Sequence, residues 1–284
     1  MMENTPESTS PSTSGDGRDG PVDSGAFASP ATSLLSLRGI SKNFGPVQAL
    51  QDCDLDVPAG QVTALIGDNG AGKSTLVKCM SGIYAPASGQ TFWNGKEVNI
   101  HTPRDASDLG IATVYQDLAL CDNLDIVQNM FLGREETKYQ MLSEIKMELA
   151  TKQTLKDLSV TTVKSVRQLV GSLSGGQRQA VAVARAVMRD SKLVVMDEPT
   201  AALGVTQTKL VLELIRTLAS RGVSVLVISH NLLDVFGVAD RIAVMYLGTI
   251  VSEGPIANYD TTSAVELITT GESSRVASRL SSSL

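Results

Sequence analysis

The stretch that decides the fold reads Gly67-Asp68-Asn69-Gly70-Ala71-Gly72-Lys73-Ser74. It fits the pattern G-x-x-x-x-G-K-[ST] of phosphate-binding loops. The apolar run 61–66 before it predicts a short buried strand, and residues 74–81 after it carry apolar side chains at helical spacing. A glycine-rich loop in this setting directs backbone N–H groups and the positive end of a helix dipole toward one anion. The stretch therefore predicts a nucleoside triphosphate site, in which Lys73 reaches the β- and γ-phosphates and the Ser74 hydroxyl ligates Mg²⁺.

Composition limits the kinds of protein that this chain can be. Its 284 residues are 42% hydrophobic and 19% charged, which suits a globular protein with a sizeable core. A net charge of −6 argues against an extended nucleic-acid surface. We find neither an apolar run of about 18 residues nor the apolar core of a signal peptide, so we expect a cytosolic protein. Three widely spaced cysteines and two histidines do not form a metal-binding pattern.

The first part of the chain falls into a tail and a strand-rich segment. Residues 1–33 are mostly Ser, Thr, Pro and Gly, and such a segment buries too little apolar surface to order itself, so we interpret it as a disordered tail. The stretches that follow predict short strands over residues 34–40, 41–50, 53–57 and 90–93. Asn94-Gly95 predicts a tight hairpin turn. We expect a small antiparallel sheet here, with Trp93 in its core.

The rest of the chain alternates between α/β and helical patterns. Residues 111–115 predict a strand that leads into Gln116, whereas residues 117–189 are mainly helical in pattern, including 126–132 and 141–149. The α/β pattern then returns, with elements expected over 192–196, 205–220, 223–228, 241–251 and 263–269, before a frayed tail at 271–284. The fold class is therefore α/β, with a parallel-sheet core, an antiparallel β subdomain and an inserted α-helical subdomain, which we call the helical lobe.

Two acids end one of the predicted core strands. The strand 193–196 is followed directly by Asp197 and Glu198. The carboxyl ends of parallel strands form the ligand-binding edge of such a sheet. In a protein with a phosphate loop, Asp197 is suited to hold Mg²⁺, directly or through water, and Glu198 to polarise an attacking water. The alternative for this pair is a solvated strand end without a catalytic role.

A second glycine-containing loop identifies the family. Leu173-Ser174-Gly175-Gly176-Gln177 precedes an apolar helix over 178–188, and this arrangement also presents N–H donors to an anion. With it the chain resembles the ATP-binding-cassette (ABC) ATPases, whose signature motif is LSGGQ. The resemblance covers about residues 34–266. It implies a P-loop NTPase (RecA-like) core spanning residues 34–270 and a head-to-tail dimer, in which the signature loop of one subunit caps ATP held by the phosphate loop of the other.

The resemblance also assigns roles to residues, in motifs that occur in the family's order. Phe44 matches an aromatic residue that stacks on adenine, and Gln116 matches a loop glutamine that contacts Mg²⁺ and couples to the helical lobe. Glu198 matches the general base and His230 the switch histidine near the γ-phosphate, although a polar residue capping a helix is the alternative for His230. The implied catalytic residues are Glu198, His230, Lys73 and Gln116, and the implied metal ligands are Ser74, Gln116 and Asp197. The implied nucleotide-binding residues are Phe44, Gly67, Asp68, Asn69, Gly70, Ala71, Gly72, Lys73, Ser74, Thr75, Ser174, Gly175, Gly176 and Gln177.

One position departs from the common family pattern. After Glu198-Pro-Thr the chain reads Ala201-Ala-Leu-Gly204, where the family usually has Ser-Ala-Leu-Asp. The loss of that Asp puts coupling across the dimer through this loop in question. The same stretch, together with 123–134 and 229–240, resembles the monosaccharide-import ATPases. Many of those carry two cassettes, whereas one cassette is found here, so we expect a homodimer or pairing with a second ATPase chain.

The resemblance therefore implies an ATPase subunit of an ABC importer that powers the uptake of a sugar, with a monosaccharide as the expected class, and with ATP and Mg²⁺ as cofactors. The expected partners are membrane permease subunits and, indirectly, a periplasmic or lipid-anchored sugar-binding protein, with no nucleic acid. The expected location is the cytoplasmic face of the cell membrane, as a peripheral protein. The alternatives are the ATPase subunit of an exporter and a soluble ABC ATPase that acts on ribosomes or DNA.

Overall fold

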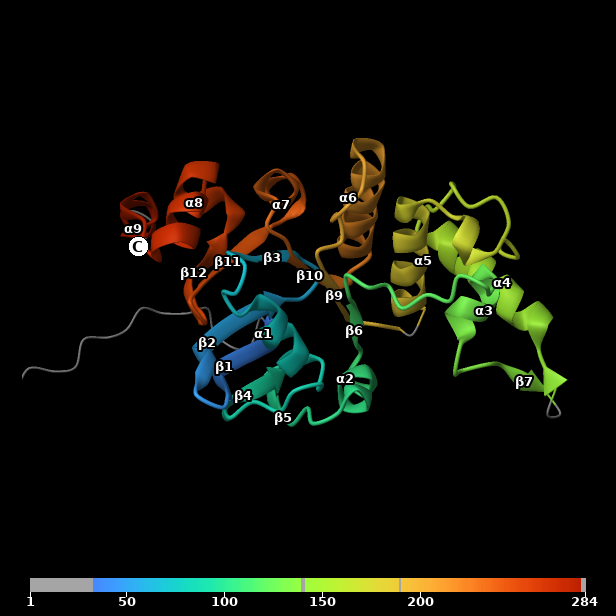
Figure 1. Cartoon of the computed structure of the whole chain (residues 1–284), viewed down its shortest axis with the longest axis horizontal. Coiled ribbons are helices and arrows are strands. Elements are labelled where there is room, and N and C mark those ends of the chain that lie inside the picture. The colour runs from blue at the N-terminus through green and yellow to red at the C-terminus, as the bar shows by residue number, and fades with distance from the viewer. Residues whose placement is uncertain (1–32, 139–140, 189, 282–284) are drawn as a thin grey trace, which may run out of the picture.

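A computed structural model describes residues 33–138, 141–188 and 190–281 (Figure 1). The tail expected at residues 1–33 lies outside the described residues, except for Ser33, where the first strand begins. The described chain forms a large, mainly parallel sheet with helices on one face and a smaller antiparallel sheet on the other, plus a helical lobe at one end. The predicted α/β fold class is confirmed.

The core sheet has six strands in the order β12-β11-β3-β10-β9-β6. Five of them run parallel, and β12 pairs antiparallel with β11 as the predicted hairpin. Their bounds are β3 Val62–Gly67, β6 Ile111–Val114, β9 Leu193–Asp197, β10 Ser224–Ile228, β11 Arg241–Tyr246 and β12 Thr249–Pro255.

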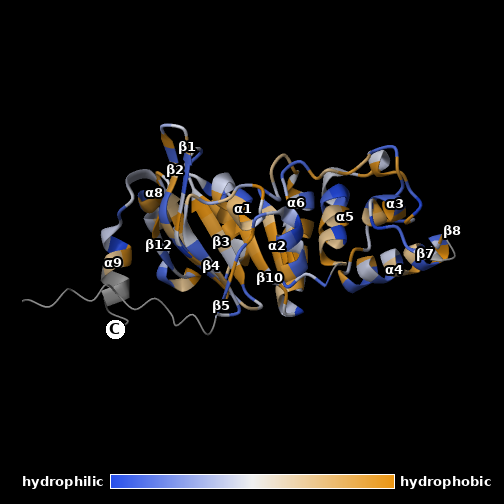
Figure 2. Cartoon of the chain, turned by 90° about the horizontal axis from the view of Figure 1, so that it is seen from below, coloured by the Kyte–Doolittle hydropathy of each residue, from blue (hydrophilic) through white to orange (hydrophobic). Residues whose placement is uncertain are grey.

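Both faces of this sheet are buried, which explains the nearly continuous apolar sequence of its strands. Along β9, Val194 and Met196 contribute to one hydrophobic cluster, while Leu193 and Val195 contribute to the other. Successive strand residues point to opposite faces, so a strand covered on both sides needs apolar residues throughout. The strands between the two layers are coloured mainly as hydrophobic in Figure 2.

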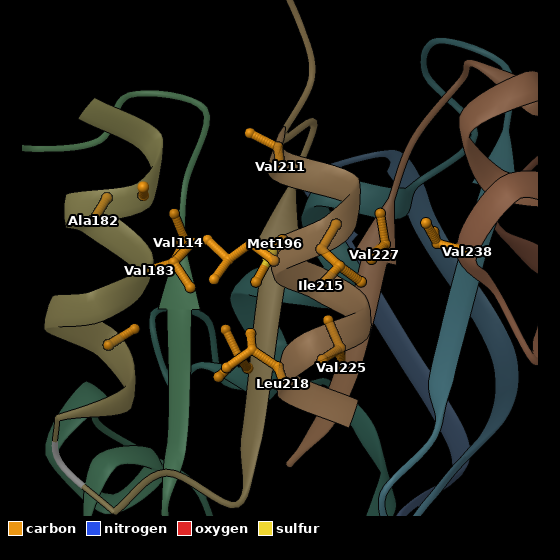
Figure 3. Packing of buried hydrophobic residues seen from close by; sticks show 14 of the residues in the cluster. Val114, Ala182, Val183, Met196, Val211, Ile215, Leu218, Val225, Val227 and Val238 are labelled. Carbon is orange, nitrogen blue, oxygen red and sulfur yellow. The ribbon is translucent and has the colours of Figure 1, made fainter. Parts of the chain in front are cut away.

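Helices cover one face of the sheet. They are α5 Gly175–Val187, α6 Val205–Ser220, α7 Leu232–Val238 and α8 Thr261–Thr270. Figure 3 shows Ile215 and Leu218 of α6 packed over Met196 and Val225 of the sheet. The opposite face carries α1 Lys73–Met80 and the antiparallel sheet.

The antiparallel sheet has the order β2-β1-β4-β5, formed by β1 Ser33–Phe44, β2 Val47–Pro58, β4 Ser88–Trp93 and β5 Lys96–Val98. The predicted hairpin turn is confirmed, since Asn94 and Gly95 have φ values of 51° and 73°. Trp93 is buried, as expected. The strand expected at 41–50 is wrong, because the chain reverses at Gly45, where φ is +57°. Residues 41–44 therefore extend β1, and residues 47–58 form one strand.

The segment 117–188 contains α3 Ile126–Phe131, α4 Glu144–Asp157, the short 3-10 helix η1 Val170–Ser172 and α5. It also contains a hairpin of two short strands, β7 Thr137–Lys138 and β8 Met141–Leu142, which the helical pattern did not predict. Met141 and Leu142 are exposed, so no packing holds them in a helix. Ser143 takes the N-cap position, and α4 begins after it.

Further elements lie outside the predicted set, including α7 described above. The helix α2, Pro103–Leu109, begins with a capping box of Thr102 and Asp105 and a proline at its start, all of which are visible in the sequence. The 3-10 helix η2, Ile256–Asn258, follows β12. The frayed tail expected at 271–284 is wrong for α9, Ser274–Ser281, because Val276 is buried in the main core and gives this helix a packing partner.

The side chain of a buried asparagine holds the loop between the core sheet and α3 by hydrogen bonds. Asn129 is fully buried, and its Nδ2 donates to the carbonyl oxygens of Cys121, Leu124 and Asp125 at 3.0, 3.3 and 3.0 Å. Its Oδ1 accepts from the Cys121 N–H at 2.7 Å. One side chain therefore fixes the loop 121–125 that joins β6 to the helical lobe.

Replacing Asn129 by Ala should lower the free energy of unfolding by about 2–4 kcal/mol, since it leaves several loop groups unsatisfied in the interior. The matched control is Asn123→Ala, because Asn123 lies in the same loop and is exposed, and its effect should stay within about 0.5 kcal/mol. Urea denaturation followed by circular dichroism measures both. Equal midpoints for the two variants would contradict the role of Asn129.

Candidate active site

A cleft of about 590 Å³ opens at the carboxyl ends of the core strands. Its walls come from the phosphate loop and α1, from Gln116 shortly after β6, and from the end of β9. The start of β2 and the β11–β12 turn complete them. The lining residues are Val47, Gln48, Ala49, Asn69, Gly70, Gly72, Lys73, Ser74, Thr75, Gln116, Asp197, Glu198, Leu247 and Gly248. Six of the fourteen residues predicted to bind nucleotide, Asn69, Gly70, Gly72, Lys73, Ser74 and Thr75, therefore line one cleft with Gln116, Asp197 and Glu198, as expected for the edge of a parallel sheet.

Close backbone packing fixes the phosphate loop. A Cβ atom at Gly67 would lie 2.4 Å from the Met245 carbonyl oxygen, and one at Gly72 would lie 2.8 Å from that of Ala49. The Gly248 N–H donates to the Ala71 carbonyl at 2.9 Å. The loop is therefore held from both sides by β2 and by the β11–β12 turn, which leaves its inner surface facing the cleft.

Lys73 lies at the start of α1 with its ammonium group against the loop. Its Nζ donates to the carbonyl oxygens of Gly67 and Asp68 at 2.7 and 2.9 Å. Burial lowers the pKa of Lys73, and the negative charges of Glu198, Asp197 and Asp68 oppose that shift. A phosphate placed in the cleft would add further negative charge and favour the charged ammonium.

Ser74, Gln116 and Asp197 bring oxygen atoms to the same cleft. Ser74 and Asp197 both line it. The pKa of Asp197 is raised, mainly by burial and further by the negative charge of the neighbouring Glu198. Lys73, Lys78 and Ser74 partly oppose this rise. No group of three potential His, Cys, Asp or Glu ligands gathers in the part of the chain that the structure describes. A hydroxyl, an amide and one carboxylate fit Mg²⁺, which keeps waters and takes phosphate oxygens as additional ligands.

Glu198 and His230 are in direct contact. The Glu198 Oε1 lies 2.8 Å from the His230 Nδ1, and the Glu198 side chain is 16% exposed whereas that of His230 is 66% exposed. Glu198 follows β9 and His230 follows β10, the neighbouring parallel strand. Adjacent strand ends therefore bring together two residues that lie far apart in the sequence, with the carboxylate on the cleft and the imidazole beside it.

The signature residues lie outside the cleft. Ser174 caps α5, its Oγ accepting from the Gln177 N–H at 3.4 Å, while the Gln177 Oε1 accepts from the Ser174 N–H at 2.9 Å. Gly175 and Gly176 pack against the first turn of α6, where a Cβ on either would meet Gln207. In Figure 1, α5 lies between α6 and the helices α3 and α4, away from α1, which follows the phosphate loop. The structure therefore does not bring the signature and phosphate loops together within one chain.

Phe44 also lies outside the cleft. Its ring packs edge-on against Tyr84 with centroids 5.2 Å apart, and the Lys42 Nζ lies 5.4 Å from its centroid. The cleft wall nearest to it is formed instead by residues 47–49. Sequence reasoning missed these residues, as well as Leu247 and Gly248, because strand pairing rather than a local motif brings them to the loop.

Comparisons with known proteins agree with the family resemblance seen in the sequence. A family model described as ABC transporter matches residues 50–201. The chain is 48% identical over 218 residues to the xylose/arabinose import ATP-binding protein XylG of Sulfolobus acidocaldarius, covering 77% of this chain and 86% of that protein. It is 46% identical over 222 residues to the fructose import ATP-binding protein FrcA of Rhizobium meliloti, covering 76% of this chain and 85% of the relative.

A solved structure shows the same fold. A nucleotide-free ATP-binding cassette from an ABC transporter superposes with a TM-score of 0.72 at 28% identity, over 84% of this chain and 100% of that chain.

Replacing Gly72 by Ala should weaken ATP binding at least about tenfold, since the added methyl group has no room beside Ala49 unless the loop moves. Gly133→Ala is the matched control, because Gly133 also has a positive φ, of +73°, but would meet nothing within 4 Å. Isothermal titration calorimetry with ATP measures the affinity, and thermal melting reports the strain common to both. Wild-type affinity in Gly72→Ala would show that the loop tolerates displacement.

Proposed function

This chain belongs to the ABC transporter family of ATP-binding cassettes, and from that premise we propose that it hydrolyses ATP to drive the import of a monosaccharide through separate permease subunits. The observation that carries the ATPase part is the Glu198–His230 contact at the edge of a phosphate-loop cleft. The sugar part is supported by the relatives, which are named as xylose/arabinose and fructose import proteins. We assign the cassette to residues 34–270 and its helical lobe to 117–189.

In the proposed reaction, water attacks the γ-phosphate in line with the leaving group. Lys73 and the loop N–H groups stabilise the negative charge that develops, which is usually the largest contribution to such catalysis. Glu198 accepts the proton of the attacking water, and His230 holds the Glu198 carboxylate in place at 2.8 Å. Mg²⁺, held by Ser74 and Asp197 with Gln116 beside it, would supply charge neutralisation at the phosphates.

We propose that the site is completed by a second cassette. The signature residues Ser174, Gly175, Gly176 and Gln177 stand at the N-terminus of α5, where Ser174 and Gly175 are exposed. Exposed N–H groups at a helix N-terminus suit a phosphate presented from outside the chain. The second cassette is either another copy of this chain or a different ATPase chain, and nucleotide is sandwiched between the two.

We propose permease subunits as membrane partners and a sugar-binding protein as an indirect one, which places this chain at the cytoplasmic face of the membrane. Among the described residues, no helix combines the length and apolar character needed to cross a bilayer. Other subunits would therefore form the sugar path, and they would select the sugar.

Glu198→Gln should leave ATP binding intact and lower kcat for ATP hydrolysis by about 10²-fold or more, because the amide cannot accept the proton of water. Glu213→Gln, an exposed glutamate on α6, is the matched control and should retain wild-type turnover. Phosphate release and ATP binding are measured in parallel. Full activity in Glu198→Gln would overturn the assignment of the general base.

A pull-down of the native protein from detergent-solubilised membranes tests the transport assignment. We expect mass spectrometry to identify a polytopic permease and a sugar-binding protein among the co-purifying chains. The Glu198→Gln variant with ATP should retain these partners, since binding precedes hydrolysis. Ribosomal or DNA-repair proteins without a permease would overturn the transport role and leave the ATPase assignment intact, and a permease without a sugar-binding protein would favour export.

A further inference from the structure

The loop that follows Glu198 has a strained backbone, and a residue of α7 makes a hydrogen bond with it. Glu198 and Ala202 have φ values of 50° and 59°, in the left-handed region that costs about 1–2 kcal/mol for a residue with a side chain. Such a conformation persists when neighbouring contacts hold it. Thr200 lies midway between the two strained residues and makes the loop's side-chain contact with α7.

The Thr200 hydroxyl donates to the Asp234 Oδ2 at 2.7 Å, and both groups are partly buried. Asp234 lies in the first turn of α7, which begins directly after His230 and its neighbour Asn231. The bond therefore joins the loop that carries Glu198 to the helix that follows His230. A hydrogen bond to a charged acceptor contributes about 1.5–3 kcal/mol, comparable to the strain in the loop.

The Thr200–Asp234 bond is one of three contacts between the segment at the end of β9 and the segment at the end of β10. The Glu198 N–H donates to the Ile228 carbonyl at 2.9 Å at the base, and the Glu198 carboxylate meets the His230 imidazole at 2.8 Å above it. The Thr200–Asp234 bond is the third contact. The first follows from strand pairing, whereas the third depends on two particular side chains.

The helix that carries Asp234 is itself anchored. Val235 and Val238 of α7 are buried in the main core, and an Arg216 guanidinium on α6 donates to the Gly237 carbonyl. A carboxylate on an anchored helix offers a fixed acceptor, so the position of Thr200 follows that of the core.

We propose that Asp234 is a positioning residue for ATP hydrolysis, which accepts the Thr200 hydroxyl and thereby fixes the Glu198 carboxylate against the His230 imidazole. Neither Thr200 nor Asp234 lines the nucleotide cleft, so both act through Glu198 and His230. The proposal rests on the roles proposed above for those two residues.

The test compares variants that remove the bond with variants that keep it. Thr200→Val and Asp234→Ala should lower kcat about tenfold or more while KM for ATP changes less than about threefold, since the cleft walls are untouched. Thr200→Ser keeps the hydroxyl and Asp234→Asn keeps an acceptor oxygen, so both should retain at least about a third of wild-type kcat. The double variant Thr200→Val/Asp234→Ala should be no slower than the slower single variant.

Thr154→Val is the matched control, because the partly buried Thr154 hydroxyl donates to the Ala150 carbonyl at 2.9 Å within α4, away from the cleft. It should retain wild-type kcat. Wild-type kcat in Thr200→Val, or equal loss in Asp234→Asn and Asp234→Ala, would overturn the positioning role.

Nuclear magnetic resonance of the histidine rings provides a readout that does not depend on turnover. The sequence contains two histidines, so a His101→Gln background leaves His230 as the single ring signal. Thr200→Val should shift the His230 ring nitrogen signals in the same direction as Glu198→Gln, and Thr154→Val should leave them unchanged. Unshifted signals in Thr200→Val would overturn the proposal even if that variant folds poorly enough to lose activity.

The same set of variants separates this proposal from the proposed function. A fully active Glu198→Gln would remove the catalytic roles on which the proposal rests, whatever the Thr200 variants do. An inactive Glu198→Gln with a fully active Thr200→Val would leave those roles in place and reject the Thr200–Asp234 bond alone.

Discussion

The parallel register of β3, β10 and β9 is the constraint on which the rest of the site depends. Ile228 of β10 pairs with Leu65 of β3 on one side and with Asp197 of β9 on the other. This register places the phosphate loop, the two acids and His230 at one edge of the sheet. A slip of one residue would turn every side chain of a strand to the opposite face, and the two hydrophobic clusters that cover β9 strongly disfavour such a slip. Core packing therefore determines where the proposed catalytic groups lie.

What the sequence predicts well is local, and what it misses depends on contacts between distant segments. The phosphate loop and the acids after β9 could be predicted because each motif is contiguous and its flanking strand or helix has a clear apolar pattern. Gly248 could not be assigned to the cleft, because it reaches Ala71 only through the pairing of β11 with β3. The stacking of Phe44 on a base stays a prediction, since its ring contacts Tyr84 edge-on and remains 43% exposed. The pattern of residues 41–50 predicts one strand, because apolar residues on both sides of Gly45 fit a single strand. It therefore does not reveal that the chain reverses at Gly45.

Gly204 acquires a structural context in the folded chain. It is the N-cap residue of α6, and its φ of −73° and ψ of 161° are open to any residue, so the backbone does not require glycine there. The first turn of α6 contacts the signature glycines through Gln207. The loop after Glu198 therefore leads within one chain from the catalytic carboxylate to the base of the signature helix. With Gly204 in place of the family's usual Asp, the contacts that this loop and the first turn of α6 make with Gly175 and Gly176 come from Leu203 and Gln207.

The charges of the cleft bear on how nucleotide binds. Lys73 is the ammonium at the loop, and the carboxylates whose fields act on it are Glu198, Asp197 and Asp68. These four groups together carry a net negative charge, and the triphosphate brings further negative charge. The carboxylates therefore repel the triphosphate strongly in a partly buried site, and only the loop N–H groups and Lys73 oppose that repulsion. The raised pKa of Asp197 reflects burial first and then the negative charge of the neighbouring Glu198. A divalent cation bound with the nucleotide would relieve both, because it would neutralise phosphate oxygens and place a positive charge beside the Asp197 carboxylate. The electrostatics of the chain's own residues therefore favour a metal–nucleotide complex over free nucleotide.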